Sequence, residues 1–273
     1  MSELRNIKWG KFIGSLLERD SLEALFKSRS LQWWFTKGFR KNGFILIDDL
    51  DGLVLEYKGV KFYPDLLNYP RMFEAWNRYR IDLIREDDIV LDIGANIGSF
   101  TLPAAQRCKR VVAVEPMFHA QLEKNIQLNE LNNVEVIDKA LWSEYCELAV
   151  DCQEYEGVYK AVPFKDFLDT YGSPDVLRLD CGGAEWDINP NLLNDVRQLE
   201  IEFHFWEGQR DKWGMWKRWL GDEGYGYTAR WSKHKHWLYL SACKGIEGLG
   251  EVQLRDGSFI GGSLKLWKSQ VTT

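Results

Sequence analysis

The architecture of this chain follows from one segment, Val90-Leu91-Asp92-Ile93-Gly94-Ala95-Asn96-Ile97-Gly98. Its apolar start predicts a buried strand, and its two glycines predict a turn that leads into a helix. Glycines in such a turn let the backbone approach a ligand closely and adopt conformations that a Cβ would hinder. The segment therefore predicts a ligand site where a strand meets a helix.

Beyond this segment the chain alternates between strand and helix patterns, which predicts an α/β fold with a mostly parallel sheet. Strands are expected at residues 88–93, 110–115, 133–137, 175–180 and 199–205, followed by a final antiparallel pair at 224–230 and 236–242. Helices are expected between them at residues 99–107, 117–131, 163–171, 185–197 and 210–220. Ligands in such sheets bind at the carboxyl ends of the strands, near the point where the strand order reverses.

The N-terminal part has a different pattern. Apolar residues have helical spacing up to about residue 40, and residues 44–47, 53–57 and 60–63 predict a hairpin or small meander. A helix is expected at residues 69–85. We therefore expect an N-terminal appendage of helices and a β-hairpin over residues 1–68, and a main domain over residues 69–273. The apolar Trp33-Trp34-Phe35 could form the interface of a homo-oligomer.

The residues around the turn restrict the ligand. A dinucleotide site would need Gly-x-Gly-x-x-Gly, and the third glycine is missing here. Instead Asp92 ends the strand, where its charge would repel a pyrophosphate but suit a ligand with an ammonium and a sulfonium, as in S-adenosylmethionine. Glu115 ends the next strand, about 20 residues after the turn, where an acid accepts hydrogen bonds from ribose hydroxyls. S-adenosylmethionine is therefore the expected cofactor.

Further motifs extend this pattern: Val114-Glu115-Pro116, Leu128-Asn129, Arg178-Leu179-Asp180-Cys181-Gly182-Gly183-Ala184-Glu185 and Ile201-Glu202-Phe203-His204. Together with residues 92–98 they resemble the FkbM-type branch of class I methyltransferases, over about residues 69–242. The resemblance implies a Rossmann-like, seven-stranded, mostly parallel sheet with helices on both faces and the cofactor at its carboxyl edge. It implies cofactor binding by Asp92, Gly94, Ala95, Asn96, Gly98, Glu115 and Pro116, with Asp138 and Ala140 near the adenine. Where the family signature has Glu, this chain has Gly182, so one expected carboxylate is missing.

The same resemblance implies an enzyme that methylates the oxygen of a small-molecule or glycan hydroxyl. Such a transfer needs aligned reactants and a base for the hydroxyl proton. The candidates are Asp180, His204 and Glu202, because the fourth and fifth strands deliver them to one edge. Glu185 is a further candidate at a helix start, where the helix dipole favours a negative charge. No metal site is expected, since His234 and His236 lack a nearby carboxylate in the sequence.

Composition weighs against some partners. The net charge of -6 argues against a broad electrostatic surface for nucleic acid, yet residues 210–235 are rich in basic residues and tryptophan. An RNA methyltransferase is therefore one alternative, and a catalytically degenerate protein that binds the cofactor or a partner is another. Trp213, Trp216 and Leu220 have helical spacing typical of core packing. A platform for the acceptor is the functional alternative for the cluster of Trp206, Trp213, Trp216, Trp219, Trp231 and Trp237.

Compartment and membrane signals are few. The five cysteines are scattered and lack Cys-x-x-Cys spacing, which indicates reduced, mostly structural thiols. No apolar run approaches the roughly 18 residues needed to span a bilayer, and the N-terminus has no secretory pattern. A cytoplasmic location is therefore expected.

Overall fold

The computed structural model describes residues 45–49, 52–63, 78–152, 155–205, 210–231, 237–246, 252–253 and 259–260. The chain divides into two compact units, Met1–Pro70 and Arg71–Thr273. In the first unit, β1 (Ile45–Asp49), β2 (Gly52–Tyr57) and β3 (Val60–Phe62) form an antiparallel meander. This confirms the expected β-hairpin. The expected helices before residue 41 and the segment Trp33-Trp34-Phe35 lie outside the described residues.

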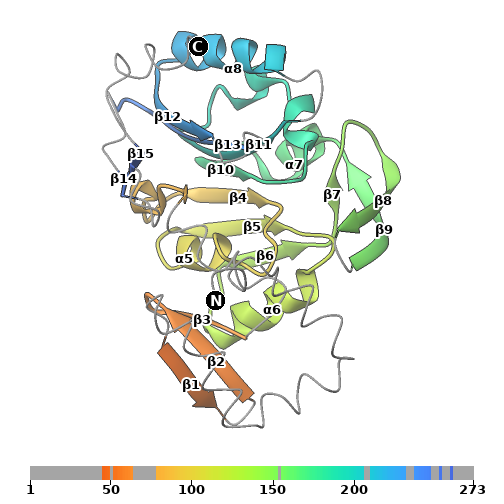
Figure 1. Cartoon of the computed structure of the whole chain (residues 1–273), viewed down its shortest axis with the longest axis vertical. Helices are drawn as coiled ribbons and strands as arrows, with labels where there is room; N and C mark the ends of the chain where they lie inside the picture. Colours follow the sequence, from red (N-terminus) through yellow and green to blue (C-terminus); the bar gives the residue numbers. More distant parts are fainter. Residues whose placement is uncertain are drawn as a thin grey trace, which may run out of the picture. The chain divides into compact units, whose positions relative to one another are not determined.

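The second unit is built on a seven-stranded sheet with the order β12-β13-β11-β10-β4-β5-β6 (Figure 1). Its strands are β4 (Ile89–Ile93), β5 (Arg110–Val114), β6 (Val134–Ile137), β10 (Val176–Leu179), β11 (Gln198–His204), β12 (Tyr225–Trp231) and β13 (Trp237–Lys244). Within this described sheet β13 alone is antiparallel to its neighbours β11 and β12. The strand order reverses between β4 and β10, as in Rossmann-like folds, which confirms the predicted fold class.

One face of this sheet forms the apolar core. Helices α7 (Phe164–Tyr171) and α8 (Arg210–Asp222) contribute to that core, where Trp213, Trp216 and Trp219 are buried. Core packing is thus the role of these tryptophans. Helices α5 (Thr101–Ala105) and α6 (His119–Leu128) follow β4 and β5. Among the helices that the structure describes, none is both long and apolar enough to cross a membrane.

The opposite face carries a row of buried polar side chains. The strand register places Arg178 beside Asp92 on one side and Glu200 on the other, and Glu200 beside Ser241. All four are buried. Cross-strand neighbours project from the same face of a sheet, so this row brings charged groups together below the carboxyl edge.

Two expected helices of this unit differ from the structure, one throughout and one at its C-terminal end. Residues 185–197 do not form one helix but two short 3-10 helices, η4 (Ala184–Asp187) and η5 (Pro190–Leu193). Pro190 has no N–H and disfavours a helical residue before it, so the chain ends one turn and starts another. Of the expected helix 69–85, residues 69–77 lie outside the described residues and Arg78 is helical. The helix does not continue to residue 85, because Tyr79 and Arg80 are not helical and Ile81–Leu83 form the separate 3-10 turn η3.

A small sheet was not anticipated. It contains β7 (Ala140–Leu141), β8 (Cys146–Cys152) and β9 (Tyr155–Val162), which stand apart from the main sheet in Figure 1. Two further short strands, β14 (Val252–Gln253) and β15 (Phe259–Ile260), pair with each other. Because β7 follows β6 after two residues, the small sheet begins at the carboxyl edge of the main one.

Candidate active site

The turn after β4 has a backbone that glycine makes accessible. Gly94 has φ +85°, and a Cβ there would lie 1.9 Å from the carbonyl oxygen of Asp180. Gly98 has φ +98°, and its Cβ would lie 2.8 Å from a methyl of Leu122. The first glycine therefore lets the turn touch the end of β10, and the second lets it pack on α6.

The amides of this turn are used within the chain. Gly94 and Ala95 donate to the carbonyl of Val114 at 2.8 and 3.1 Å, and Gly98 donates to Ala95. Asn96 donates to Glu115 Oε2 at 2.7 Å, and the Ile97 amide donates to Asn96 Oδ1. A pyrophosphate site needs unpaired amides at a helix start. This turn instead fits a cofactor without phosphate.

Glu115 ties the turn after β4 to the turn after β5. Its Oε1 accepts the amides of Met117 and Phe118 at 2.8 and 3.0 Å, and its Oε2 accepts that of Asn96. Burial raises the pKa of Glu115, and the three amides oppose the shift. Since a carboxylate has about four acceptor positions, backbone amides fill most of those of Glu115.

The expected adenine-side residues follow β5 and β6. Pro116 is half-buried and its carbonyl lies 3.1 Å from Nδ1 of His119. The same nitrogen lies 3.6 Å from the exposed carboxylate of Asp138. Ala140 is buried at the start of β7. The turns after β5 and β6 are thus joined at the carboxyl edge, with the small sheet beginning beside them.

Asp92 does not meet the expectation of an acid open to a cationic ligand. It is fully buried, its Oδ2 accepts from the hydroxyl of Thr101 at 2.5 Å, and its Oδ1 lies 3.1 Å from Nη1 of Arg178. Burial raises the pKa of Asp92, and the guanidinium opposes this. Arg178 compensates the charge of the acid, so Asp92 is paired within the chain.

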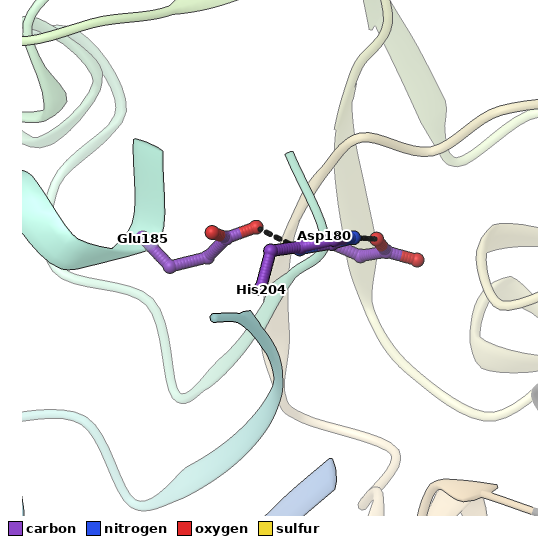
Figure 2. A group of neighbouring side chains, drawn as sticks. All are labelled: Asp180, Glu185 and His204. Atoms are coloured by element: carbon purple, nitrogen blue, oxygen red, sulfur yellow. Dashed lines mark hydrogen bonds and ion pairs between the residues drawn. The ribbon is translucent and has the colours of Figure 1, made fainter. Parts of the chain in front are cut away.

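Three acids, Asp180, Glu185 and Glu202, surround His204 at the end of β11. Figure 2 shows its ring between the carboxylates of Glu185 and Asp180. Nδ1 lies 3.2 Å from Glu185 Oε1, while Nε2 lies 3.7 Å from Asp180 Oδ1 and 3.9 Å from Glu202 Oε1. Burial would lower the pKa of His204, but the hydrogen bond that its ring donates to Glu185 and the three negative charges outweigh burial and raise the pKa to about 9. His204 is therefore a cation at neutral pH.

The four candidate bases differ in access. The side chain of Asp180 is 25% exposed, His204 15%, Glu202 7% and Glu185 0%. Glu202 also forms a 3.0 Å ion pair with Arg78. Asp180 is thus the most accessible of the four side chains.

Asp180, Glu185 and His204 also bring metal-ligating atoms within 4.8 Å of one another. The imidazole, however, turns a different nitrogen toward each acid, and a cation would have to displace its proton. The ring and its neighbours fit a hydrogen-bonded ion network better than a metal site. His234 and His236 lie outside the described residues.

The loop after β10 departs from an acidic signature. Gly182 and Gly183 have φ +70° and +119°, a region that glutamate rarely adopts. Burial and the nearby Glu185 and Asp180 raise the pKa of Cys181 well above its usual value, so this thiol is not activated. The loop therefore supplies Asp180 and Glu185 without a further acid or a thiolate.

Aromatic residues lie at the same edge of the sheet as His204. Trp237 pairs across the ladder with His204 and is 39% exposed, and the rings of Phe205 and Trp231 are 4.5 Å apart. An aromatic platform for the acceptor, formed by Trp231 and Trp237, stays a prediction. Trp206 lies outside the described residues.

Sequence reasoning overlooked Arg178 and Thr101, the partners of Asp92. One signal was present: Arg178 is the single basic residue in the strand pattern of residues 175–180. A charge inside a buried strand is rare unless it is paired.

Known proteins resemble this chain over part of its length. Residues 58–162 match the model of the TRM5/TYW2 methyltransferase domain. A probable ribosomal RNA small subunit methyltransferase A from Methanosphaera stadtmanae is 34% identical over 85 residues, which cover 30% of this chain and 29% of that protein. The 23S rRNA (uracil(1939)-C(5))-methyltransferase RlmD of Haemophilus influenzae is 27% identical over 97 residues, 33% of this chain and 22% of that protein. The chain thus spans less than a third of the length of these relatives.

Among solved structures, Trm5b from Pyrococcus abyssi has a TM-score of 0.41 and 13% identity, covering 73% of this chain and 63% of that one. A likeness this distant carries no argument about function. The matched domain is one that uses S-adenosylmethionine for methyl transfer, and the sheet order is that of a Rossmann-like fold, which together support S-adenosylmethionine as the cofactor. The matches lie with the TRM5/TYW2 domain and do not support the FkbM branch that the signature residues resembled.

Proposed function

We propose that this chain transfers a methyl group from S-adenosylmethionine to an RNA. The observation that carries the proposal is the match of residues 58–162 to the TRM5/TYW2 methyltransferase domain. The named relatives described above, which are ribosomal RNA methyltransferases, support it. They favour RNA over the small-molecule or glycan hydroxyl that the FkbM resemblance implied.

The proposed cofactor residues lie on the β4 and β5 side of the strand-order reversal. Glu115 holds the ribose, and the turn of Gly94, Ala95, Asn96 and Gly98 shapes the methionine side. Pro116, Asp138 and Ala140 border the adenine. Bound there, the cofactor supplies the electrophilic methyl group.

On the other side of the reversal, Asp180 is the proposed catalytic residue. It follows β10 directly and has the most exposed side chain of the four candidates. Its carboxylate accepts a hydrogen bond, or a proton, from the acceptor atom that is methylated. His204, a cation, cannot serve as the base at neutral pH and instead holds the carboxylate in place. Glu185 and Glu202 are kept from the acceptor by burial.

The test measures transfer of a labelled methyl group from S-adenosylmethionine. Purified protein is incubated with bulk transfer RNA, with ribosomal RNA, and with a panel of sugars and other small hydroxyl compounds. We expect ribonuclease-sensitive label in RNA. Label confined to the small-molecule fraction, or no label in either RNA, would contradict the proposal.

A pair of variants checks the site. Asp180→Asn should lower the transfer rate about 100-fold or more while the affinity for S-adenosylhomocysteine stays within a few fold. Asp195→Asn makes the same chemical change at an exposed residue before the start of β11, at the opposite edge of the sheet. It should leave the rate unchanged.

A further inference from the structure

One buried guanidinium lies between the cofactor side and the acceptor side of the site. Arg178 is 4% exposed and sits in β10, beside Asp92 of β4. A buried arginine is rare unless its hydrogen-bond donors are paired. The groups to which Arg178 donates hydrogen bonds therefore indicate its role.

Its two terminal nitrogens reach three groups. Nη1 donates to Oδ1 of Asp92 at 3.1 Å and to the carbonyl oxygen of Gly94 at 2.5 Å. Nη2 donates to Oδ2 of Asp180 at 2.6 Å. Because the guanidinium is rigid and planar, these contacts fix the three groups relative to one another.

Neutralising Asp92 would need one contact only. The other two go to the turn that shapes the cofactor site and to the acid that faces the acceptor. The same two turns also touch through their backbones, since a Cβ on Gly94 would overlap the carbonyl of Asp180. Nothing in this arrangement requires a particular acceptor.

We infer that Arg178 is a positioning residue that locks the cofactor turn after β4 to Asp180 after β10. It thereby sets the distance between the methyl donor and the group that receives the acceptor. The acceptor half of this inference rests on the proposed function, whereas the cofactor half does not. A displacement of about 1 Å from the aligned position can lower the rate of transfer about 100-fold.

Three variants separate positioning from charge balance. Arg178→Lys keeps the positive charge but replaces the fork by a single ammonium. The double variant Asp92→Asn with Arg178→Met removes both charges of the buried pair, so neither is left unpaired. Thr101→Val removes the other hydrogen bond of Asp92 and leaves the contacts to Gly94 and Asp180 in place.

The readouts are melting temperature, the Kd for S-adenosylhomocysteine by calorimetry, and kcat and KM for methyl transfer to RNA. Arg178→Lys and the double variant should fold, bind S-adenosylhomocysteine about 10-fold more weakly or worse, and lose about 100-fold in kcat. Thr101→Val should lower the melting temperature but keep the Kd within about threefold, because the hydrogen bond that it removes lies away from the turn.

A wild-type Kd and kcat in the double variant would overturn the inference, because Arg178 would then only neutralise Asp92. Failure of Arg178→Lys to fold would overturn it as well, since the residue would then serve folding. If the wild-type chain bound S-adenosylhomocysteine but methylated no RNA, the proposed function would fail. The calorimetric comparison would still decide whether Arg178 holds the cofactor turn.

Discussion

Glu200 is a fully buried acid in β11, and its carboxylate accepts hydrogen bonds from Ser241 at 2.5 Å and Gln198 at 2.7 Å. Burial raises its pKa from 4.5 to about 7, and these hydrogen bonds oppose the shift only in part. The folded chain therefore binds this proton more tightly than the unfolded chain. The stability that Glu200 contributes is fully present below about pH 4.5 and is lost as the pH rises through about 7.

Replacing this acid should remove that pH dependence. Relative to Glu200→Gln, we expect wild-type protein to lose on the order of 3 kcal/mol of unfolding free energy between pH 4.5 and 8.5. Urea unfolding at a series of pH values measures the difference. Glu144→Gln, the same change at an exposed residue, should follow wild type. Parallel curves for wild type and Glu200→Gln would show that Glu200 does not titrate in this range.

The pH profile also distinguishes two roles for His204. Held as a cation by three carboxylates, with its pKa raised to about 9, it should support methyl transfer at neutral pH and fail above about pH 9. A neutral histidine base would give the opposite profile, a rate that rises as the proton leaves. We expect kcat to fall above about pH 9 in wild type and His204→Gln to lose that fall. Calorimetry with S-adenosylhomocysteine over the same range controls for loss of cofactor binding.

Single residues were predictable where their signal is local. The position of Glu115 next to the glycine turn was predictable from its spacing, and its carboxylate accepts a hydrogen bond from the Asn96 amide of that turn. The partner of Asp92 could not be found this way, because Arg178 is remote in sequence and becomes a neighbour only through strand register. Nor could the protonation of His204, which depends on acids from three separate segments.

Strands and helices were predictable where the apolar residues of the sequence are also the residues that the fold buries. The seven strands of the main sheet lie within a few residues of their expected ranges, because most of their residues are buried and apolar. The strands β8 and β9 were missed because part of their surface is exposed, as at Val158, and their sequences carry charges. The break at Pro190 shows a second limit, where local chemistry overrides an apolar period.

The turn after β4 offers a prediction for an element. Gly94→Ala adds a Cβ 1.9 Å from the Asp180 carbonyl at φ +85°, so the turn and the end of β10 must separate. Gly172, after α7, has φ +81°, and a Cβ there would meet no described atom within 4 Å. Gly172→Ala should cost only the backbone strain, about 1–2 kcal/mol of unfolding free energy. Gly94→Ala should cost more and also abolish measurable binding of S-adenosylhomocysteine. Equal losses of stability in both variants, with cofactor binding retained, would contradict the close contact.

On the scale of the whole molecule, charge and function must be reconciled. The net charge of -6 gives no broad attraction for an RNA backbone, and the acceptor side itself contains Asp180, Glu185 and Glu202. Recognition of RNA by this chain should therefore depend on a few phosphate contacts and on the group placed at the site. Lys212 is an exposed basic residue at this edge, where it lies 3.4 Å from Asp187 of η4.

Few phosphate contacts predict a weak dependence on salt. Each contact with single-stranded RNA contributes about -0.7 to the slope of log affinity against log salt concentration, so two or three contacts give a slope near -2. Filter binding between 50 and 200 mM salt measures it. Lys212→Ala should flatten the slope by about 0.7. Lys109→Ala, an exposed lysine before β5 at the opposite edge of the sheet, should not change it. A slope of about -5 or steeper would mean instead that a broad basic surface, outside the site described here, carries the RNA.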